Sequence, residues 1–416
     1  MSYCRRIGKN VHTRRFLLAG GAALASTGYS FNAFARKVRG GATHAHAPAA
    51  AAATQPAPVP ETPAITPVGP VDTVARWACI LDYNSGATLL EKAADERMPP
   101  SSLTKMMTAY VTFTMLKSGR LKLDQTLPVS EKAWRMQGSR MFVPLGQSVS
   151  VEDLIQGMVI QSGNDACVVL AEGISGSEEQ FVALMNEMAG KLGLTNSHFL
   201  NATGWPADGH YMSARDVAYL ALRLIHDFPE YYHYFSEKEF FFNKIRQENR
   251  NALVVKGLAD GLKTGHTDAG GFGLCASSER EGRRVILALN GMPTSNVRAR
   301  ESERLMGWAF ANFESAKILS KGDVVEQAPV WMGQVQTVPL VVAQDFTMLL
   351  PHGWRNSTHV SLDYQGPLAA PLKQGQPAGQ LTVLLPGGRQ ALVPVVVGQD
   401  VPALGVLGRA ARRLHL

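Results

Sequence analysis

The sequence Pro100-Ser101-Ser102-Leu103-Thr104-Lys105 opens a long apolar run and places a lysine three positions after a serine. An α-helix turns once in about 3.6 residues, so Ser102 and Lys105 are expected on the same face of a helix, one turn apart. A serine hydroxyl attacks a carbonyl well only when a base takes its proton, and a lysine is such a base when burial lowers its pKa. The stretch therefore predicts Ser102 as a nucleophile with Lys105 as its base.

The residues after Lys105 predict the buried helix that this chemistry needs. Met106 to Leu116 leaves few polar positions on any side. Ser101 is the expected N-cap, and Ser118-Gly119 is the expected end of the helix. A nucleophile in the first turn would lie at the positive end of the helix dipole, which stabilises an oxyanion.

Ser-x-x-Lys alone does not identify a catalytic site, because a chain of this length contains about one such motif by chance. Two further motifs supply the missing evidence. In Ser162-Gly163-Asn164, the glycine is expected to interrupt a helix over 151–160 and to place the serine and the asparagine on a loop. Lys263-Thr264-Gly265 is expected to end a strand. Each tripeptide alone is typical of an ordinary turn. All three in this order have a chance expectation of about 0.01, which favours one shared site.

Turn and capping signals predict a mixed α/β (α+β) fold around these motifs. Asn84-Ser85-Gly86 predicts a hairpin, and capping boxes predict helices that start after Ser150, Ser177 and Ser213. Strand patterns cover residues 258–264, 271–277 and 285–290, and a helix is expected over 304–313. We interpret this part as a central antiparallel sheet flanked by helices.

The pattern becomes all-β after about Lys321. Strands are predicted over residues 338–342, 347–350, 360–362, 380–385 and 391–397, separated by Pro/Gly turns. This segment carries no catalytic motif. We interpret it as a small β-sandwich that positions or docks the rest of the protein.

The sequence patterns at the two ends of the chain predict a segment for export and a segment for attachment. A basic start, an apolar core and Ala33-Phe34-Ala35 predict a signal peptide, in which Arg14-Arg15 partly matches a twin-arginine signal; an uncleaved anchor is the alternative. Near the C-terminus, Leu404, Leu407, Ala411 and Leu414 lie opposite Arg409, Arg412 and Arg413 on a helical projection, which favours a membrane-surface helix or a disordered basic tail. The expected location is the periplasm or cell envelope, with attachment to the inner-membrane surface.

The predicted organisation therefore has five parts. They are a signal peptide (1–35), a Pro/Ala-rich linker (36–72), a catalytic domain (73–316), a β-sandwich (317–400) and a short basic amphipathic tail (401–416).

Charge and cysteine content exclude several classes of protein. The formal net charge of +7 comes from the two ends, since residues 1–35 and 401–416 contain arginine or lysine but no acid, so no nucleic-acid partner is expected. Cys79, Cys167 and Cys275 lie in apolar contexts and are expected to be buried, and an odd number of cysteines cannot pair fully within the chain. No zinc-binding spacing occurs, and His44-Ala45-His46 falls in the linker.

The three motifs together resemble those of the penicillin-recognising serine enzymes. The longer stretches Gln161 to Cys167 and Asp260 to Asp268 resemble the low-molecular-mass penicillin-binding proteins that are D-alanyl-D-alanine carboxypeptidases, over roughly residues 74–400. This resemblance implies a β-lactamase/transpeptidase-like catalytic domain and no cofactor or metal. It also implies peptidoglycan stem peptides as substrates and β-lactam antibiotics as covalent inhibitors. The linker and the short tail depart from the family, whose usual anchor is a longer C-terminal amphipathic helix.

The resemblance also implies roles for individual residues. Ser102 would attack the carbonyl of the penultimate D-alanine, Lys105 would take its proton, and water would hydrolyse the acyl-enzyme. Ser162 would relay protons, and Asn164 would bind the substrate amide. The backbone amides of Ser102 and His266 would form the oxyanion hole, next to Gly265.

The remaining implied roles concern the substrate carboxylate. Lys263 would supply positive potential, and Thr264, Arg298 and Arg215 would receive the carboxylate of the terminal D-alanine.

Three other readings stay open. An endopeptidase that cuts peptide cross-links would use the same site. A β-lactamase would need a fast deacylation base, for which no clear Glu-x-x-x-Asn stretch appears between the second and third motifs. A non-catalytic cell-wall binder would have no need of all three motifs.

Overall fold

The computed structural model describes residues 62–356, 358–385 and 390–413. The predicted signal peptide, most of the predicted linker and His44-Ala45-His46 lie outside the described residues. Within the described residues, no helix is both long and apolar enough to span a bilayer.

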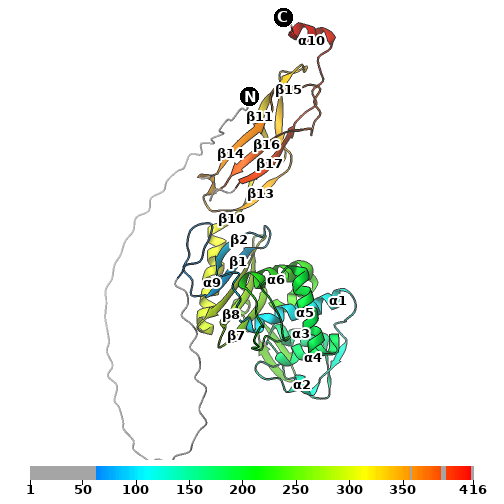
Figure 1. Ribbon diagram of the computed structural model, residues 1–416, viewed down its shortest axis with the longest axis vertical. Coiled ribbons are helices and arrows are strands. Elements are labelled where there is room, and N and C mark those ends of the chain that lie inside the picture. The colour runs from blue at the N-terminus through cyan, green and yellow to red at the C-terminus, as the bar shows by residue number, and fades with distance from the viewer. Residues whose placement is uncertain (1–61, 357, 386–389, 414–416) are drawn as a thin grey trace, which may run out of the picture. The chain divides into compact units, whose positions relative to one another are not determined.

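A five-stranded antiparallel sheet forms the centre of the first domain, in the order β2-β1-β9-β8-β7 (Figure 1). Its strands are β1 (Trp77–Asp82), β2 (Thr88–Lys92), β7 (Gly261–Thr267), β8 (Gly271–Arg280) and β9 (Arg283–Met292). Gly86, in the predicted hairpin, has a φ of 68°, a conformation that glycine adopts without strain. The predicted hairpin is therefore confirmed.

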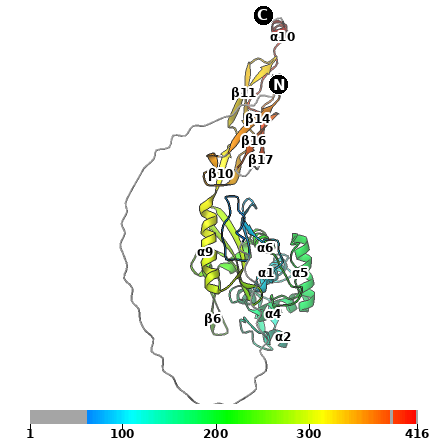
Figure 2. The same cartoon turned by 60° about the vertical axis from the view of Figure 1, so that its left-hand side comes forward.

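The two faces of this sheet are covered by different helices. Successive side chains of a strand point to opposite faces, so Cys79 and Ala288 pack into the helical core of α1, α3, α4 and α6, while Ile80 and Leu287 pack against α9. Figure 2 shows α9 on one side of the domain and α1, α4 and α5 on the other. Ser102 and Asn164 lie on η1 and α4 of the helical side, whereas Lys263-Thr264-Gly265 lies on β7, the edge strand of the sheet.

The helices and short strands of this domain follow the chain order. They are η1 (Ser101–Thr104), α1 (Lys105–Lys117), β3 (Thr126–Pro128), α2 (Glu131–Trp134), β4 (Ser148–Ser150), α3 (Val151–Val159), α4 (Asn164–Ser175), α5 (Glu178–Leu192), α6 (Ala214–Asp227), α7 (Pro229–Tyr232), η2 (His233–Ser236), β5 (Glu239–Phe242), β6 (Ile245–Glu248), α8 (Ala252–Val255) and α9 (Ser295–Asn312).

The predicted capping boxes are confirmed at all three positions. The hydroxyls of Ser150, Ser177 and Ser213 each accept a hydrogen bond from the backbone amide three residues later, at the starts of α3, α5 and α6. Gly119, at the predicted end of α1, has a φ of 72°. These features depend on neighbouring residues, so the sequence predicts them well.

Three local predictions were wrong. Ser101 does not cap α1: its hydroxyl bonds to Pro100 O, and Ser101 to Thr104 form a 3₁₀ turn that continues into α1. Asn164 is not on a loop but is the first residue of α4, after Gly163 at the N-cap. Lys263-Thr264-Gly265 lies inside β7, because pairing with β8 continues to Thr267.

The domain boundaries also differ from those predicted. Ala64 is fully buried and pairs with Val71, and Ile65 pairs with Glu91, so the chain is part of the first domain before residue 73. At the other end, β10 (Phe313–Leu319) pairs with β13 (Phe346–Pro351), so the second domain begins near Phe313 rather than at 317.

The second domain consists of strands, as predicted. A six-stranded sheet has the order β14-β16-β17-β12-β11-β15, and β10 and β13 form a separate two-stranded ribbon. Ala316 of β10 and Leu350 of β13 are buried in the same hydrophobic core as the residues of the six-stranded sheet. The strands of the larger sheet are β11 (Val324–Trp331), β12 (Thr337–Val342), β14 (His359–Tyr364), β15 (Leu368–Ala369), β16 (Pro377–Leu384) and β17 (Gln390–Val397). A 3₁₀ turn, η3 (Trp354–Asn356), precedes β14, and a last helix, α10 (Val406–Arg413), follows the sheets. Sequence patterns missed β10, β11 and β15.

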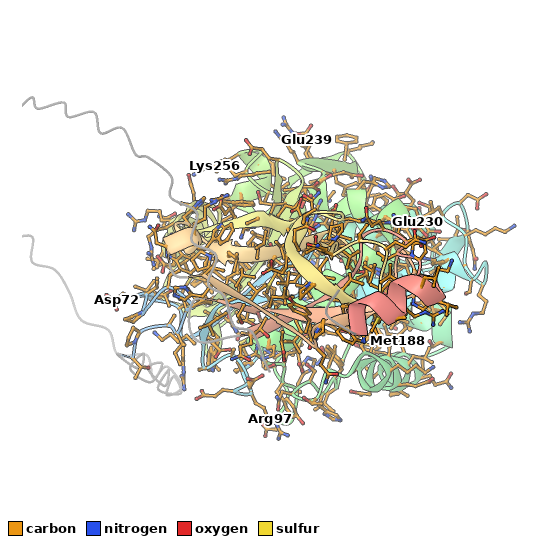
Figure 3. All side chains as sticks on the ribbon, turned by 90° about the horizontal axis from the view of Figure 1, so that it is seen from above. Asp72, Arg97, Met188, Glu230, Glu239 and Lys256 are labelled. Carbon is orange, nitrogen blue, oxygen red and sulfur yellow. The ribbon has the colours of Figure 1, made fainter. Side chains whose placement is uncertain are left out.

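Apolar side chains are mostly buried in the interior, and charged side chains are mostly exposed. Cys79, Cys167 and Cys275 are buried, as predicted, and all three are free thiols. Charged side chains such as Asp72, Glu230 and Lys256 are exposed and project from the surface in Figure 3.

Candidate active site

Ser102 and Lys105 meet because the chain enters α1 through a 3₁₀ turn. Residues i and i+3 lie above one another in such a turn, and the Lys105 Nζ atom is 3.0 Å from Ser102 Oγ. Lys105 is the first residue of α1 and its side chain is fully buried. The predicted pair is therefore brought into contact.

Two further oxygen atoms hold the Lys105 amine. Its Nζ atom donates to Asn164 Oδ1 at 2.7 Å and to the backbone oxygen of Thr203 at 2.6 Å. Both oxygens can only accept hydrogen bonds, so a neutral amine donates one of its two N–H groups to each of them. Its lone pair then faces the Ser102 hydroxyl, which is the arrangement that a general base requires.

The orientation of Asn164 is fixed from the opposite side. Its Nδ2 atom donates to Gln137 O at 2.7 Å, which leaves Oδ1 for Lys105. The Asn164 backbone amide donates to Ser139 O at 2.7 Å. Ser162 is buried nearby on a backbone with φ of 68°, and its hydroxyl makes no hydrogen bond to the residues that the structure describes.

Burial and neighbouring cations favour the neutral form of both lysines. Burial lowers the pKa of Lys105 from 10.5 to about 8, and the Arg250 charge acts in the same direction. The pKa of Lys263 is also well below its usual value because this side chain is buried, and because Lys105, Arg250 and Arg298 lie near it. The site thus gathers four basic side chains, Lys105, Lys263, Arg250 and Arg298.

The strand that carries Lys263-Thr264-Gly265 runs directly past Ser102. A Cβ atom on Gly265 would overlap Ser101 Oγ and would lie 3.3 Å from the backbone nitrogen of Ser102. Only glycine lets β7 approach η1 this closely. Thr264 is buried beside it, whereas the exposed His266 ring stacks on Phe272 with 3.9 Å between ring centroids.

Two arginines of the site, Arg298 and Arg250, have different surroundings. Arg298 of α9 is half-buried, and its guanidinium lies over the Phe272 ring at 5.8 Å, close enough to Lys263 to affect it. Arg250, which sequence reasoning missed, donates to Ser139 Oγ at 2.6 Å. Within the described ranges, neither makes an ion pair with an acid. Both are therefore available to an anionic ligand.

Arg215 does not belong to this cluster, and its predicted role was wrong. Its guanidinium forms ion pairs with Asp95 and Glu91, at 2.7 Å each, and bonds to Thr88 of β2. The sequence Ser213-Ala214-Arg215-Asp216 is explained by the capping of α6 and by these ion pairs.

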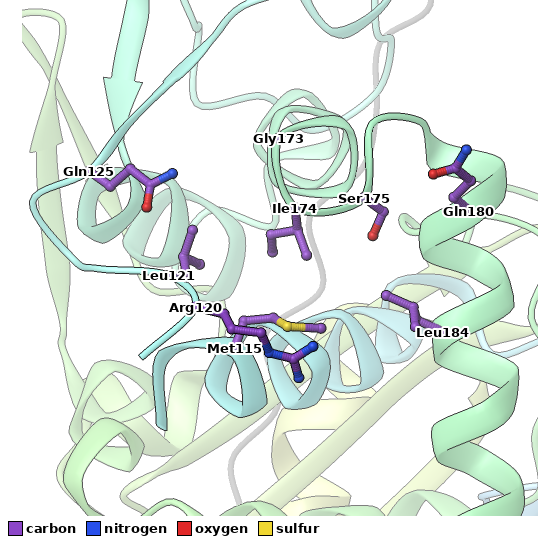
Figure 4. A pocket seen from close by; sticks show the side chains of 9 residues that line it. All are labelled: Met115, Arg120, Leu121, Gln125, Gly173, Ile174, Ser175, Gln180 and Leu184. Carbon is purple, nitrogen blue, oxygen red and sulfur yellow. The ribbon is translucent and has the colours of Figure 1, made fainter. Parts of the chain in front are cut away.

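The described hollow of about 580 Å³ lies away from this cluster (Figure 4). It is lined by Met115 of α1, Ile174 of α4 and Leu184 of α5, with Arg120 at its edge. None of the predicted site residues contributes to it. The catalytic assignment therefore rests on the hydrogen bonds around Lys105 and not on this hollow.

The fold and the site together define a serine enzyme of the penicillin-recognising class, in which Lys105 contacts Ser102, Asn164 binds Lys105 and a Lys-Thr-Gly strand approaches Ser102. The family described as D-alanyl-D-alanine carboxypeptidase matches residues 64–294, and the penicillin-binding protein 5 C-terminal domain matches residues 313–403. The chain belongs to the D-alanyl-D-alanine carboxypeptidase family, so the predicted serine carboxypeptidase is confirmed.

Individual relatives agree with this membership. The chain is 41% identical over 344 residues to D-alanyl-D-alanine carboxypeptidase DacC of Escherichia coli, an alignment that covers 80% of this chain and 86% of that protein. It is 40% identical over 339 residues to DacA of the same organism, covering 79% and 84%.

Solved structures confirm the predicted fold class. Penicillin-binding protein 5 from Haemophilus influenzae matches with a TM-score of 0.65 and 38% identity, covering 80% of this chain and 99% of that one. Penicillin-binding protein D2 from Listeria monocytogenes, solved in an ampicillin-bound form, matches with a TM-score of 0.53 and 30% identity, covering 58% and 98%.

Proposed function

We propose that this protein removes the terminal D-alanine from peptidoglycan pentapeptide stems through an acyl-enzyme on Ser102. The observation that carries the proposal is the placement of Lys105 Nζ between Ser102 Oγ, Asn164 Oδ1 and Thr203 O. This arrangement, in a family of D-alanyl-D-alanine carboxypeptidases, supports a lysine-activated serine.

Acylation begins with the neutral form of Lys105. The Ser102 hydroxyl gives its proton to the Lys105 lone pair, and its oxygen attacks the carbonyl carbon of the penultimate D-alanine. The negative charge that develops on the carbonyl oxygen is received by the backbone amides of Ser102 and His266. Gly265 supports this role, because it lets β7 come close to the Ser102 amide.

Collapse of the tetrahedral intermediate then breaks the peptide bond. The nitrogen of the leaving D-alanine takes a proton through Ser162, whose hydroxyl is free of described hydrogen bonds, and water later hydrolyses the ester. Asn164 binds the substrate amide while it orients Lys105.

The terminal carboxylate of the substrate binds the cation cluster. Thr264 and Arg298 receive it directly, Lys263 supplies positive potential, and we add Arg250 to this group because it lies near both lysines. A carboxylate would partly neutralise this group, in which Arg298 and Arg250 make no ion pair with an acid among the residues that the structure describes.

The test of the function is D-alanine release together with penicillin labelling. Ser102→Ala is expected to abolish both, and mass spectrometry of the penicillin-treated protein is expected to place the adduct on Ser102. Ser101→Ala is the matched control, because it removes the adjacent hydroxyl and should leave the adduct in place. An adduct on any other residue would overturn the assignment.

Product analysis separates this reaction from its alternatives. A pentapeptide should lose one D-alanine, whereas an endopeptidase would separate cross-linked muropeptides and a β-lactamase would turn over penicillin rapidly. Cross-link cleavage that outpaces D-alanine release would favour the endopeptidase.

The location is a separate part of the proposal. We infer export to the periplasm and contact with the inner-membrane surface through the short C-terminal helix. In α10, Val406 and Leu407 are exposed and Arg409 follows them, which suits an interfacial helix on anionic lipid. Cosedimentation with anionic vesicles should fall when Val406 and Leu407 are both replaced by glutamine; unchanged binding would contradict this attachment.

A further inference from the structure

The hairpin of β11 and β12 presents two apolar side chains to solvent at its turn. Trp331 is 50% exposed at the end of β11, and Val335 is 40% exposed in the turn that leads to β12. The turn is closed by the Val330 backbone amide, which donates to Gln336 O at 2.8 Å. The two side chains are therefore held on an ordered hairpin, so a partner can cover them at little cost in conformational entropy.

The segment that leads into α10 is attached to the same turn. Gly333 of the turn pairs with Ala403. The Leu404 backbone amide donates to Met332 O at 2.8 Å. Because α10 begins at Val406, two residues after this bond, the start of the helix and the hairpin turn lie at the same end of the second domain.

Strand β15 completes this end of the domain. Leu368 pairs with Val330 and Ala369 pairs with Trp331, and the Ala370 backbone amide donates to Trp331 O at 2.9 Å. The three neighbouring segments 331–336, 365–372 and 401–408 are called the tip below.

The tip contains no charged residue, whereas the charges that follow it are basic. Its three segments include no Asp, Glu, Lys, Arg or His. Asp400, which precedes the last segment, is paired with Lys373 at 3.8 Å. The helix then continues with Arg409, Arg412 and Arg413. An uncharged apolar surface beside a group of arginines is complementary to an anionic bilayer, in which acyl chains lie beneath phosphate groups.

We propose that the tip inserts Trp331 and Val335 into the interface of an anionic phospholipid bilayer beside α10, an inference that rests on the proposed attachment of α10. An indole has apolar faces and one N–H donor, so tryptophan favours the depth between head groups and acyl chains. Two contacts with one bilayer bind more tightly than either alone, because the second forms within an already bound molecule. Since the tip is part of the folded second domain, its insertion also fixes which end of that domain faces the bilayer.

The first experiment measures whether Trp331 reaches the acyl chains. The chain has six tryptophans, of which Trp331 alone lies in the tip. Phosphatidylglycerol–phosphatidylcholine vesicles with brominated acyl chains are added to the full-length protein, and indoles that reach the chains lose fluorescence. We expect quenching in the wild type and in Trp134→Phe, the matched control at an exposed position of the first domain, and its loss in Trp331→Phe. Equal quenching in all three proteins overturns the inference.

The second experiment measures affinity for the same vesicles without bromine. Trp331→Ala is expected to raise Kd about tenfold and Val335→Ser about threefold, because each removes apolar surface from the contact. Trp134→Ala should leave Kd unchanged. Thermal unfolding of each variant shows whether the second domain is folded, and Val335→Ser carries the test if Trp331→Ala is not.

The outcomes distinguish this inference from the proposed location. If the wild type does not bind anionic vesicles, both are overturned. If replacing Val406 and Leu407 by glutamine weakens binding while Trp331→Ala and Val335→Ser do not, α10 is the attachment and the tip is not. A dimer in sedimentation equilibrium without lipid that Trp331→Ala dissociates would assign the tip to a second copy of this chain, which also overturns the lipid contact.

Discussion

The side-chain oxygen of Asn164 accepts a hydrogen bond from Lys105 Nζ at 2.7 Å, although the two residues are far apart in the sequence. This bond joins the start of α4 to the start of α1. It leaves the amine one position for the Ser102 hydroxyl. The proposed role of the lysine as a base therefore depends on a contact between two helices.

The pH dependence of acylation should follow the Lys105 amine. Because its pKa is lowered to about 8, the neutral base is the minor form at pH 7, and kcat/KM should rise about tenfold per pH unit below 8. Stopped-flow measurement of the acylation rate with penicillin between pH 6 and 9.5 tests this rise with pH.

Lys105→Arg is the corresponding variant, since a guanidinium keeps the charge and cannot act as a base. We expect acylation to fall at least about a thousandfold. The base role would be contradicted if the pH–rate profile of the wild type gave an apparent pKa near the ordinary lysine value of 10.5. It would also be contradicted if Lys105→Arg were acylated at nearly the wild-type rate.

Arg298 and Arg250, which make no ion pair within the described part of the chain, should select for a free C-terminal carboxylate. Arg298→Gln and Arg250→Gln are each expected to lower kcat/KM about tenfold or more for a D-Ala-D-Ala peptide, and much less for its C-terminal amide. Arg215→Gln is the matched control, because Arg215 is held by Asp95 and Glu91. Equal carboxylate preference in all three variants would remove Arg298 and Arg250 from the carboxylate site.

The close approach of β7 to η1 can be tested by a double-mutant cycle. Gly265→Ala is expected to slow acylation, because the added methyl group overlaps Ser101 Oγ and displaces the strand from Ser102. Ser101→Ala removes the overlapping atom, so the double variant should recover part of the lost rate. Additive losses would show that the strand acts by another route.

His210 should make stability depend on pH. Its Nδ1 accepts from the Leu200 amide and its Nε2 lies 2.9 Å from Thr104 Oγ1, so the ring fits these partners in the neutral form. Burial lowers its pKa from 6.5 to about 4, so the unfolded chain binds a proton in this interval that the folded chain does not. Stability from this group is complete above pH 6.5 and is lost as the pH falls towards 4.

Urea unfolding of wild type and His210→Gln at pH 7 and pH 4.5 measures this contribution. The variant should be less stable at pH 7, and the difference should shrink by on the order of 2 kcal/mol at the lower pH. His359→Gln, at an exposed position on β14, serves as the control. A difference that is constant with pH would show that His210 acts only through packing.

The sequence by itself determined the features that depend on neighbouring residues. A serine and a lysine three positions apart had to share one face of the entry into α1, and the serines before α3, α5 and α6 had to cap them. Alternation of side chains also predicted strands of the central sheet and β12, β13, β14, β16 and β17 of the second domain, although it missed β10, β11 and β15. In each case the interacting groups are within a few residues or follow a fixed period.

Tertiary structure alone decided how the site was completed. Thr203 O and Arg250 lie outside the three motifs, and Arg298 and Arg215 look alike in sequence, yet only Arg298 is left without an acid among the described residues. Sequence patterns cannot assign these roles, because the partners come together only when β7, α4 and the 201–205 segment pack around Lys105. The burial that lowers the Lys105 pKa arises from the same packing.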